Sequence, residues 1–433
     1  MVLQQSSAQK IWGWANPLEK VFVTTSWDNK TDSVIVPPDA GWNITVHTPA
    51  AGGPYTITIR GANTITLQNV LIGEVWVCSG QSNMEMSYSW GMPLMKEDVP
   101  KAYNNNIRFF TVAKASSDYP QDDCKGAWAV SDSNTVKTFS TAAYYFGKRL
   151  NAELNIPIGL INTSWGATSA EVWTPEATVN ADPILKQVAT RLGVNPYCPI
   201  KPGCVYNTMI SPLLNYNIAG AIWYQGETNT GTAATYKQLF TSMITAWRTA
   251  WNKDLPFYYV QIAPFTYGNN YNSAILREQQ TQTLQLANTG MVVITDITGD
   301  TTDIHPKNKR DVGYRLAGWA LAETYNKQGL VYKNALYKSM EVKDGNIIIS
   351  FSNADGGLTS KDGPVKQLLI AGADKVFYSA QAEIKGDKLV VHSAAVKQPV
   401  AVRYSFTNTS IGNLFGPGGL PVNQFRTDDW ILQ

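Results

Sequence analysis

Short runs rich in β-branched and aromatic residues alternate with turn residues through the first part of the chain. The turns are marked by Asn16-Pro17, Pro37-Pro38 and Gly52-Gly53-Pro54. Because such spacing is typical of antiparallel sheets, we predict a β-domain segment over residues 1–72. Its expected strands cover 10–14, 20–25, 42–47 and 54–60.

The last hundred residues carry a similar pattern. Strand-like runs at 347–352, 376–378 and 389–392 are separated by hairpin signals such as Asp344-Gly345 and Gly386-Asp387. We therefore expect a β-rich segment over 331–433. It forms either a second β-sandwich or a single one together with residues 1–72.

Between these segments, residues 73–330 alternate apolar strand-like runs with helix-like stretches. The strand-like runs are 74–78, 158–162, 219–224, 257–262 and 291–295, and the helix-like stretches are 142–154, 236–251 and 273–287. Strand–helix alternation predicts a parallel sheet covered by helices on both faces. The expected fold class is therefore α/β, with a central domain flanked by antiparallel β segments.

Composition narrows the partners. Thirty-five basic and 33 acidic residues give a net charge of +2, which argues against nucleic acid or an anionic membrane as partner. Aromatic residues reach 11%, which suits a protein that stacks rings on sugars but equally suits a large core. No apolar run is long enough to span a membrane, and the first residues lack the pattern of a signal peptide.

The four cysteines leave the redox state open. Cys198 and Cys204 frame a short loop that a disulfide could close, which would leave Cys78 to pair with Cys124. Thiols buried in a core are the alternative. The possible disulfides favour an extracytoplasmic location, secreted or periplasmic.

Four predicted strands end in polar or glycine-rich sequence. These ends are Gly80-Gln81-Ser82-Asn83, Thr163-Ser164-Trp165-Gly166, Gln225-Gly226-Glu227-Thr228-Asn229 and Asp303-Ile304-His305-Pro306. Ligands bind beyond the carboxyl ends of parallel strands, so these groups should gather at one edge of the sheet. A serine, a histidine, an aspartate, a glycine amide and a side-chain amide suffice for acyl transfer.

His305 is the histidine that local sequence favours as a base. Pro306 suits a first helical position, and apolar residues at helical spacing follow over 307–325, so we expect His305 at a helix start that keeps its ring neutral. His47 and His392 lie in β-like runs without such a context. We find neither paired histidines nor CxxC spacing for a metal, and no phosphate-binding glycine loop.

Each of these residues also has a structural interpretation. Ser82 could be a turn serine, Gly166 could serve only its loop, and Glu227 could cap the next helix. Cys78 is better explained as a small core residue than as a nucleophile.

Three blocks carry a family resemblance: GEVWVCSGQSNM at 73–84, WYQGETN at 223–229 and DIHPKNK at 303–309. Together with MVLQ at 1–4 and IWGWA at 11–15, they resemble the SGNH-type hydrolases, specifically the sialate O-acetylesterase family of carbohydrate acetylesterases. The resemblance covers roughly residues 1–325 and implies a three-layer α/β/α sandwich. The final hundred residues match only as β-rich sequence.

The resemblance also implies roles. Ser82 corresponds to the nucleophile and His305 to the general base, while the N–H groups of Ser82 and Gly166 form the oxyanion hole. A side-chain amide completes the hole, for which we prefer Gln225 over Asn229. The wider superfamily spaces its acid and base as DxxH, whereas Thr302 occupies that place here. We therefore favour Asp303 as the residue that orients His305, with Asp300 or a backbone carbonyl as alternatives.

The expected reaction is hydrolysis of acetyl esters on a carbohydrate, such as O-acetylated sialic acid or acetylated xylan, through an acetyl-serine intermediate. No metal or cofactor is expected, and the sugar and the oligomeric state stay open. Bulky Trp165, Trp223 or Met84 would restrict the acyl group to acetyl. Further candidates for the substrate pocket are Gln81, Asn83 and Glu227. The alternatives are an SGNH lipase or thioesterase and a non-catalytic carbohydrate-binding protein.

Overall fold

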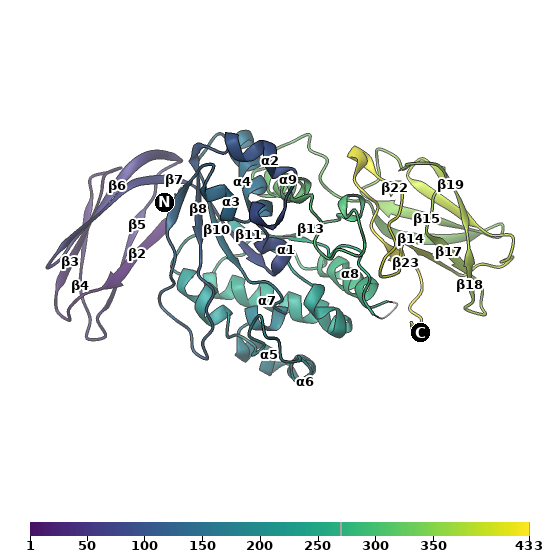
Figure 1. The fold of residues 1–433 in the computed structure, drawn as a ribbon, viewed down its shortest axis with the longest axis horizontal. Helices are drawn as coiled ribbons and strands as arrows, with labels where there is room; N and C mark the ends of the chain where they lie inside the picture. The colour runs from purple at the N-terminus through teal and green to yellow at the C-terminus, as the bar shows by residue number, and fades with distance from the viewer. Residues whose placement is uncertain (269–270, 433) are drawn as a thin grey trace. The chain divides into compact units, whose positions relative to one another are not determined.

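The computed structural model describes residues 1–268 and 271–432. The chain divides into two compact units. Unit 1 comprises Met1–Trp223 and Ser242–Phe257, and unit 2 comprises Tyr224–Thr241 and Tyr258–Gln433. Each unit contains strands and helices of its own (Figure 1).

The N-terminal strands of unit 1 confirm the predicted antiparallel pattern except for β1, which pairs in parallel with β7. They are β1 (Val2–Gln4), β2 (Ala8–Trp14), β3 (Lys20–Thr25), β4 (Thr31–Ile35), β5 (Gly41–His47) and β6 (Gly52–Arg60). Strand β3 lies between β4 and β6, and β2 pairs with β5 as a separate two-stranded ribbon. Alternating buried and exposed residues along β5 place one of its faces on a core.

Strand β7 (Thr64–Gly80) runs from this segment into the central sheet. Its first half pairs antiparallel with β6, Leu71 pairs with Val2 of β1, and its last residues pair in parallel with β10 (Ile158–Ser164). Residues 70–80 are buried throughout, as expected of a strand covered on both faces. The boundary predicted at 72/73 therefore lies inside one continuous strand rather than in a linker.

The central sheet of unit 1 has the strand order β11-β7-β10-β8-β9. Strands β7, β10 and β8 (Asn104–Thr111) are parallel, as predicted, whereas β9 (Trp128–Ser131) pairs antiparallel with β8 at the edge. Strand β11 (Gly220–Tyr224) completes this part. The α-helices that lie wholly in the first stretch of this unit are α1 (Ser82–Glu85), α2 (Met95–Asp98), α3 (Thr135–Thr138), α4 (Thr141–Leu154), α5 (Glu176–Ala181) and α6 (Pro183–Ala189).

Aromatic side chains fix helices to both faces of this sheet. Trp76 of β7 packs edge-on against Phe146 of α4, with ring centroids 5.1 Å apart. Gly220 faces the Trp76 ring, so Trp223, three residues along the same strand, points to the opposite face. There it packs against Trp247 of α7 (Tyr236–Trp251), with centroids 6.1 Å apart. The predicted helix-covered α/β sheet is confirmed.

In unit 2, β12 (Phe257–Val260) and β13 (Thr289–Val292) are neighbours, and α8 (Asn272–Thr283) and α9 (Lys309–Trp319) belong to the same part. The helix predicted from Pro306 begins later. The Asn308 side chain caps α9 by accepting a hydrogen bond from the Asp311 N–H, so Pro306 lies in the preceding loop.

The C-terminal part of unit 2 is a β-sandwich. Its strands are β14 (Leu336–Lys343), β15 (Asn346–Ser352), β16 (Thr359–Ser360), β17 (Leu368–Ala371), β18 (Phe377–Ser379), β19 (Gln381–Lys385), β20 (Lys388–His392), β21 (Ala401–Tyr404), β22 (Leu414–Phe415) and β23 (Phe425–Arg426). Two four-stranded sheets, β14-β15-β20-β19 and β18-β17-β21-β23, share one core that includes Ile349 and Ile370. These strands and those of residues 1–72 belong to different sheets and different units.

Two predictions from composition can be checked. The redox state of the cysteines was left open by the sequence; in the structure all four are free thiols, and neither a Cys198–Cys204 nor a Cys78–Cys124 disulfide is formed. Cys78 is a buried residue of β7, as its interpretation as a core residue requires. Across residues 1–268 and 271–432, no helix has the length and apolarity that a membrane span needs.

Candidate active site

The end of β7 presents Ser82 to solvent. Gly80 adopts φ +139°, a conformation that a residue with a side chain rarely adopts, and Ser82 then begins the short helix α1. Ser82 is half-buried, whereas its neighbours Gln81 and Asn83 are buried. The turn therefore leaves the serine as the accessible residue of this stretch.

Gly166 lies beside Ser82, as the parallel arrangement of β7 and β10 predicts. Ser164 of β10 is in register with Gly80, and the Trp165 N–H donates a 3.0 Å hydrogen bond to the Gly80 carbonyl. A Cβ atom placed on Gly166 would stand 3.4 Å from the Cβ of Ser82. A side chain at position 166 would therefore crowd the serine.

Glu85 is a residue of this site that sequence reasoning missed. Its Oε2 atom accepts a 2.6 Å hydrogen bond from the Gly166 N–H, and its Oε1 atom pairs with Lys114 Nζ at 2.6 Å. The amide predicted to stabilise an oxyanion thus already binds a carboxylate, and a substrate oxygen can receive this bond only after Glu85 moves. Its position three residues after Ser82, within the same motif, was the available signal.

The bulky residues predicted to limit the acyl group differ in accessibility. Met84 is fully buried, and Trp223 is fully buried between Trp173 and Trp247 in the core of unit 1. Trp165 is half-exposed beside Gly166, and its Nε1 donates to the Tyr197 carbonyl at 3.0 Å. Of the three, Trp165 is the residue placed to contact a ligand.

Unit 2 holds Gln225 and Asn229 in one buried chain of hydrogen bonds. Gln225 Nε2 donates to Asn229 Oδ1 at 2.8 Å, and Gln225 Oε1 accepts from the Tyr236 hydroxyl at 2.8 Å. Gln225 is completely buried. Because its amide is held at both ends, Gln225 orients Asn229, whose Nδ2 is 3.4 Å from Thr232 Oγ1, at the long end of hydrogen-bond range.

Glu227 and Lys309 are two buried titratable residues of unit 2. Glu227 is buried at the start of a 3₁₀ segment, and Lys309 Nζ lies 4.7 Å from the centroid of the Tyr224 ring. Burial lowers the pKa of Lys309 to about 7, an effect that the negative charge of Glu227 opposes. The sequence placed Glu227 among the pocket candidates but gave Lys309, within the DIHPKNK block, no role.

His305 lies in the loop before α9 with Asp303 beside it. Its Nδ1 is 3.8 Å from Asp303 Oδ1, and that same oxygen accepts a 2.9 Å hydrogen bond from the His305 backbone N–H. The second Asp303 oxygen pairs with Lys307 Nζ at 3.2 Å. Asp303 thus interacts electrostatically with the His305 ring, and it fixes the loop by accepting a hydrogen bond from the His305 backbone.

The surroundings of His305 and Asp303 shift the pKa of both residues. Burial, Lys309 and Lys307 lower the pKa of His305 and outweigh the opposing effect of Asp303, so the ring is neutral at pH 7. Burial is the main cause, whereas the sequence had pointed to a helix start, which lies further along the chain at Lys309. Burial raises the pKa of Asp303, but the hydrogen bond from His305 and the charge of Lys307 lower it by more, so the pKa lies below its usual value.

Asp300 is committed elsewhere. Its two oxygens accept from the Thr302 N–H at 2.8 Å and from the Thr302 hydroxyl at 2.7 Å, within an exposed turn. Among the described residues, no group of three or more His, Cys, Asp or Glu side chains could hold a metal ion.

Comparison with known proteins gives the class. The model of the family described as carbohydrate esterase, sialic acid-specific acetylesterase matches residues 72–325. A solved carbohydrate acetylesterase from Xanthomonas citri is 36% identical, covers 99% of this chain and 97% of its own, and has a TM-score of 0.90.

Mammalian relatives agree. The sialate O-acetylesterase of Mus musculus is 28% identical over 81% of this chain and 77% of its own length. The sialate O-acetylesterase of Homo sapiens is 29% identical over 79% and 72%, respectively. The chain belongs to the sialic acid-specific acetylesterase family and is a carbohydrate esterase.

Proposed function

We propose that this enzyme removes acetyl groups from carbohydrates through an acetyl-serine intermediate on Ser82. The observation that carries the proposal is the accessible Ser82 on a glycine turn, beside Gly166, at the carboxyl end of β7. Membership in a family of carbohydrate esterases supports the chemistry. The neutral, partly buried His305 has the protonation state that a general base needs.

In the first half of the proposed reaction, His305 takes the Ser82 proton while Oγ bonds to the acetyl carbon. The oxyanion accepts hydrogen bonds from the backbone N–H groups of Ser82 and Gly166 and from one side-chain amide. The bond between the acetyl carbon and the sugar oxygen then breaks, and the sugar alkoxide takes the proton from His305. Water, activated by the same histidine, releases acetate and restores Ser82.

Hydrogen bonds and ion pairs within each unit support three choices in this proposal: the residue that orients His305, the third oxyanion donor, and the part that Glu85 plays. Asp303 is the better candidate to orient His305, because both oxygens of Asp300 bind Thr302. Asn229 is the better candidate for the third oxyanion donor, because Gln225 is held by Tyr236 and Asn229. Glu85 must leave the Gly166 N–H for that amide to act.

Measuring acetate released from O-acetylated sialic acid and from acetylated xylan tests the function. We expect release from at least one substrate, and Ser82→Ala should abolish it. Ser33→Ala, at an exposed serine of β4, is the matched control and should retain full activity. Hydrolysis that persists in a folded Ser82→Ala variant would contradict the serine mechanism, and a complete absence of hydrolysis by the wild type would favour a binding protein.

A series of nitrophenyl esters tests the acyl group. We expect acetate to be cleaved much faster than butyrate, because Trp165 stands beside the serine turn. Equal rates would favour a lipase or thioesterase. A location outside the cytoplasm is part of the same proposal, since glycans are its substrates, and the free thiols add no support to it.

A further inference from the structure

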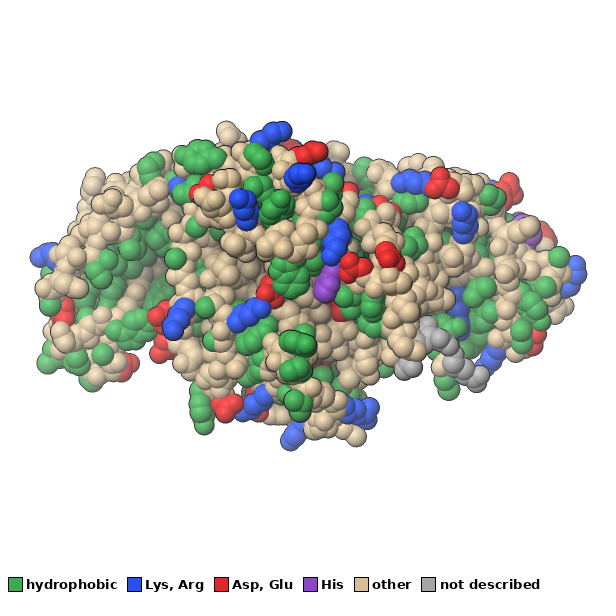
Figure 2. Space-filling model, in the orientation of Figure 1, with side chains coloured by type: hydrophobic (Ala, Val, Ile, Leu, Met, Phe, Trp, Pro, Cys, Tyr) green, Lys and Arg blue, Asp and Glu red, His purple; other side chains and the backbone are tan. Residues whose placement is uncertain are grey.

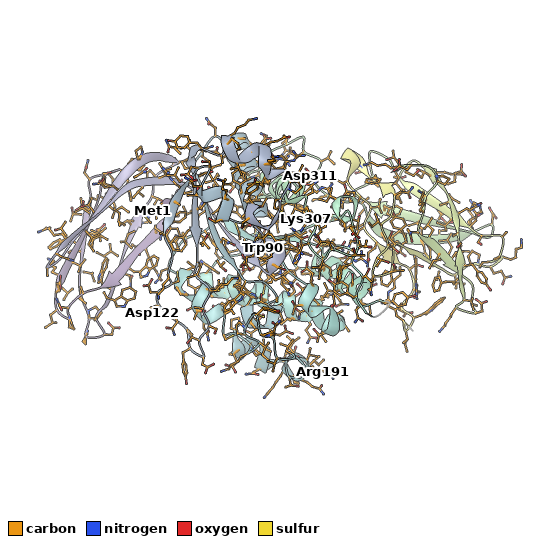
Figure 3. All side chains as sticks on the ribbon, viewed as in Figure 1. Met1, Trp90, Asp122, Arg191, Lys307 and Asp311 are labelled. Carbon is orange, nitrogen blue, oxygen red and sulfur yellow. The ribbon has the colours of Figure 1, made fainter. Side chains whose placement is uncertain are left out.

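A groove in unit 1 lies away from the residues proposed for catalysis. Its cavity of about 280 Å³ is bounded on one side by the β2–β5 ribbon and on the other by residues 121–122 and 211–215. Asp122, labelled in Figure 3, lies on the side of unit 1 where the N-terminal strands meet the central sheet. All parts of the groove belong to this one unit.

One wall of the groove carries aromatic rings. Trp12 and Trp14 are two residues apart on β2 and therefore share one face of the ribbon. Trp14 is 54% exposed, whereas Trp12 packs edge-on against the buried Tyr216. Hydrophobic side chains are visible on the surface over the N-terminal strands in Figure 2. The exposed Trp14 ring therefore offers a platform on which a sugar ring can stack, beside the anchored Trp12.

The Trp42 ring supports this wall from the other face. It lies across Gly13, where an added Cβ atom would stand only 3.2 Å from the Trp42 Cζ2 atom. Gly13 and Trp42 are also directly paired in the β2–β5 ribbon. The glycine between the two groove tryptophans therefore makes room for a third ring beneath them, which stiffens the platform.

The other lining is polar. Asn43 pairs directly with Trp12 and so lies on the same face of the ribbon. Asp39, Asp122 and Asn215 add carboxylate and amide groups around the cavity. Planar polar side chains beside an aromatic ring offer the hydrogen bonds that sugar hydroxyls need.

Hydrogen bonds hold the two walls together. Gln9 Nε2 donates to the Asn215 carbonyl at 3.2 Å, and the Asn217 N–H donates to Gln9 Oε1 at 3.1 Å. On the far wall, Ser211 Oγ donates to the Gln121 carbonyl at 3.2 Å. The groove is therefore preformed, which reduces the entropy lost when a ligand binds.

The charges around the groove select among sugars. Its two charged lining residues, Asp39 and Asp122, are both acidic and exposed. Lys10 stands at the margin, where its Nζ is 3.3 Å from Asn215 Oδ1. The two carboxylates of the groove outnumber the one ammonium group at its margin, so the groove disfavours an anionic glycan. The hydroxyl groups of a neutral sugar are the favoured partners.

We propose that this groove is a non-catalytic binding site for a neutral oligosaccharide segment, with one sugar ring stacked on Trp14. The site requires neither Ser82 nor an acetyl group. It would hold a neutral polysaccharide substrate, and to that extent it builds on the proposed esterase function. The two can fail separately, because binding is measured here without hydrolysis.

Isothermal titration with xylohexaose and cellohexaose, both free of acetyl groups, tests the site. We expect the wild type to bind at least one of them and Trp14→Ala to weaken that binding at least tenfold. Tyr103→Ala, which removes another exposed aromatic ring (69% exposed) outside the groove, should leave the Kd unchanged. A hexamer of sialic acid should bind at least tenfold more weakly than the neutral hexamer.

Several results would overturn the proposal. These are no binding of either neutral hexamer, an unchanged Kd in folded Trp14→Ala, or equal binding of the sialic acid hexamer. Light scattering after size exclusion adds one more: if Trp14→Ala changes the oligomeric state, the exposed tryptophan covers a second copy of the chain instead. Acetate release from small acetyl esters reports on the proposed esterase function independently.

Discussion

Asn229→Asp is the sharpest test of which side chain completes the oxyanion hole. The substitution keeps the shape of the side chain and the oxygen that accepts from Gln225 Nε2 at 2.8 Å. It removes the Nδ2 donor and places a negative oxygen where that donor was. If Asn229 donates to the oxyanion, this change should damage turnover while it keeps the bond from Gln225. Among the other hydrogen bonds of Asn229, it removes the long contact of Nδ2 with Thr232 Oγ1.

The expected size follows from the bonds involved. Removal of one oxyanion donor costs about 10²–10³ in kcat, or about 2.7–4 kcal/mol. Repulsion between the new carboxylate and the oxyanion adds to this loss, so we expect Asn229→Asp to lose at least about 10³. KM should change little, because the bond forms mainly in the transition state.

Gln225→Leu supplies the contrast. It removes the hydrogen bonds that the Gln225 side chain makes with the Tyr236 hydroxyl and with Asn229 Oδ1, although the Gln225 backbone carbonyl stays 3.3 Å from that hydroxyl. Loss of a buried hydrogen bond of this kind costs about 1–3 kcal/mol. We therefore expect this variant to lose several kcal/mol of unfolding free energy and to lose less kcat than Asn229→Asp. Its catalytic loss reflects a poorly oriented Asn229 rather than a missing donor.

Steady-state kinetics on an acetyl ester and urea unfolding of both variants provide the readouts. Asn229 is not the oxyanion donor if Asn229→Asp keeps more than about a hundredth of wild-type kcat. The reasoning also fails if Gln225→Leu proves the more severe catalytic lesion while remaining as stable as the wild type, because Gln225 would then be the donor.

Three further predictions concern stability, pH and thiols. Gly73→Ala places a Cβ atom 2.0 Å from the Pro157 carbonyl oxygen and should cost about 3 kcal/mol in urea unfolding, whereas Gly193→Ala, with open space around it, should change stability by less than about 0.5 kcal/mol. The lowered pKa of His305 places the acid limb of the kcat/KM profile below pH 6.5. Lys309→Met removes a positive charge that lowers this pKa, so it should move the acid limb to higher pH. An acid limb that stays in place would show that Lys309 does not act on the histidine. Between its folded and unfolded pKa values the unfolded His305 binds more protons, so its contribution to stability falls as the pH drops through 6.5 toward the folded value. Because the cysteines are free, dithiothreitol should leave the Tm unchanged, and a fall in Tm would reveal a disulfide.

Much of the fold was predictable because its pattern is local. The ends of β3 and α7 coincide with the predicted 20–25 and 236–251, since turn residues and helical periodicity mark them in the sequence. The predicted start of α9 at Pro306 was wrong because the sequence holds two possible helix starts there, a proline at 306 and a capping asparagine at 308. The structure uses the Asn308 cap. The boundary predicted at 72/73 falls within β7, because one buried strand crosses the change in composition there.

The site was predictable in its residue types and less so in their roles. Parallel strands place Gly166 beside Ser82, and this follows from the order of elements alone. The choice between Gln225 and Asn229 depends on Tyr236, and the state of the Gly166 N–H depends on Glu85. These contacts arise between side chains whose partners are set by packing, which periodicity does not encode.

Strand β7 has a consequence for how such an enzyme can be built or divided. Its residues pair first with the N-terminal strands β6 and β1, pass through Asn69 (φ 54°), and end at the turn that carries Ser82. The N-terminal segment is therefore no exchangeable cassette, because cutting at residue 72 would sever a buried strand and remove its β1 partner.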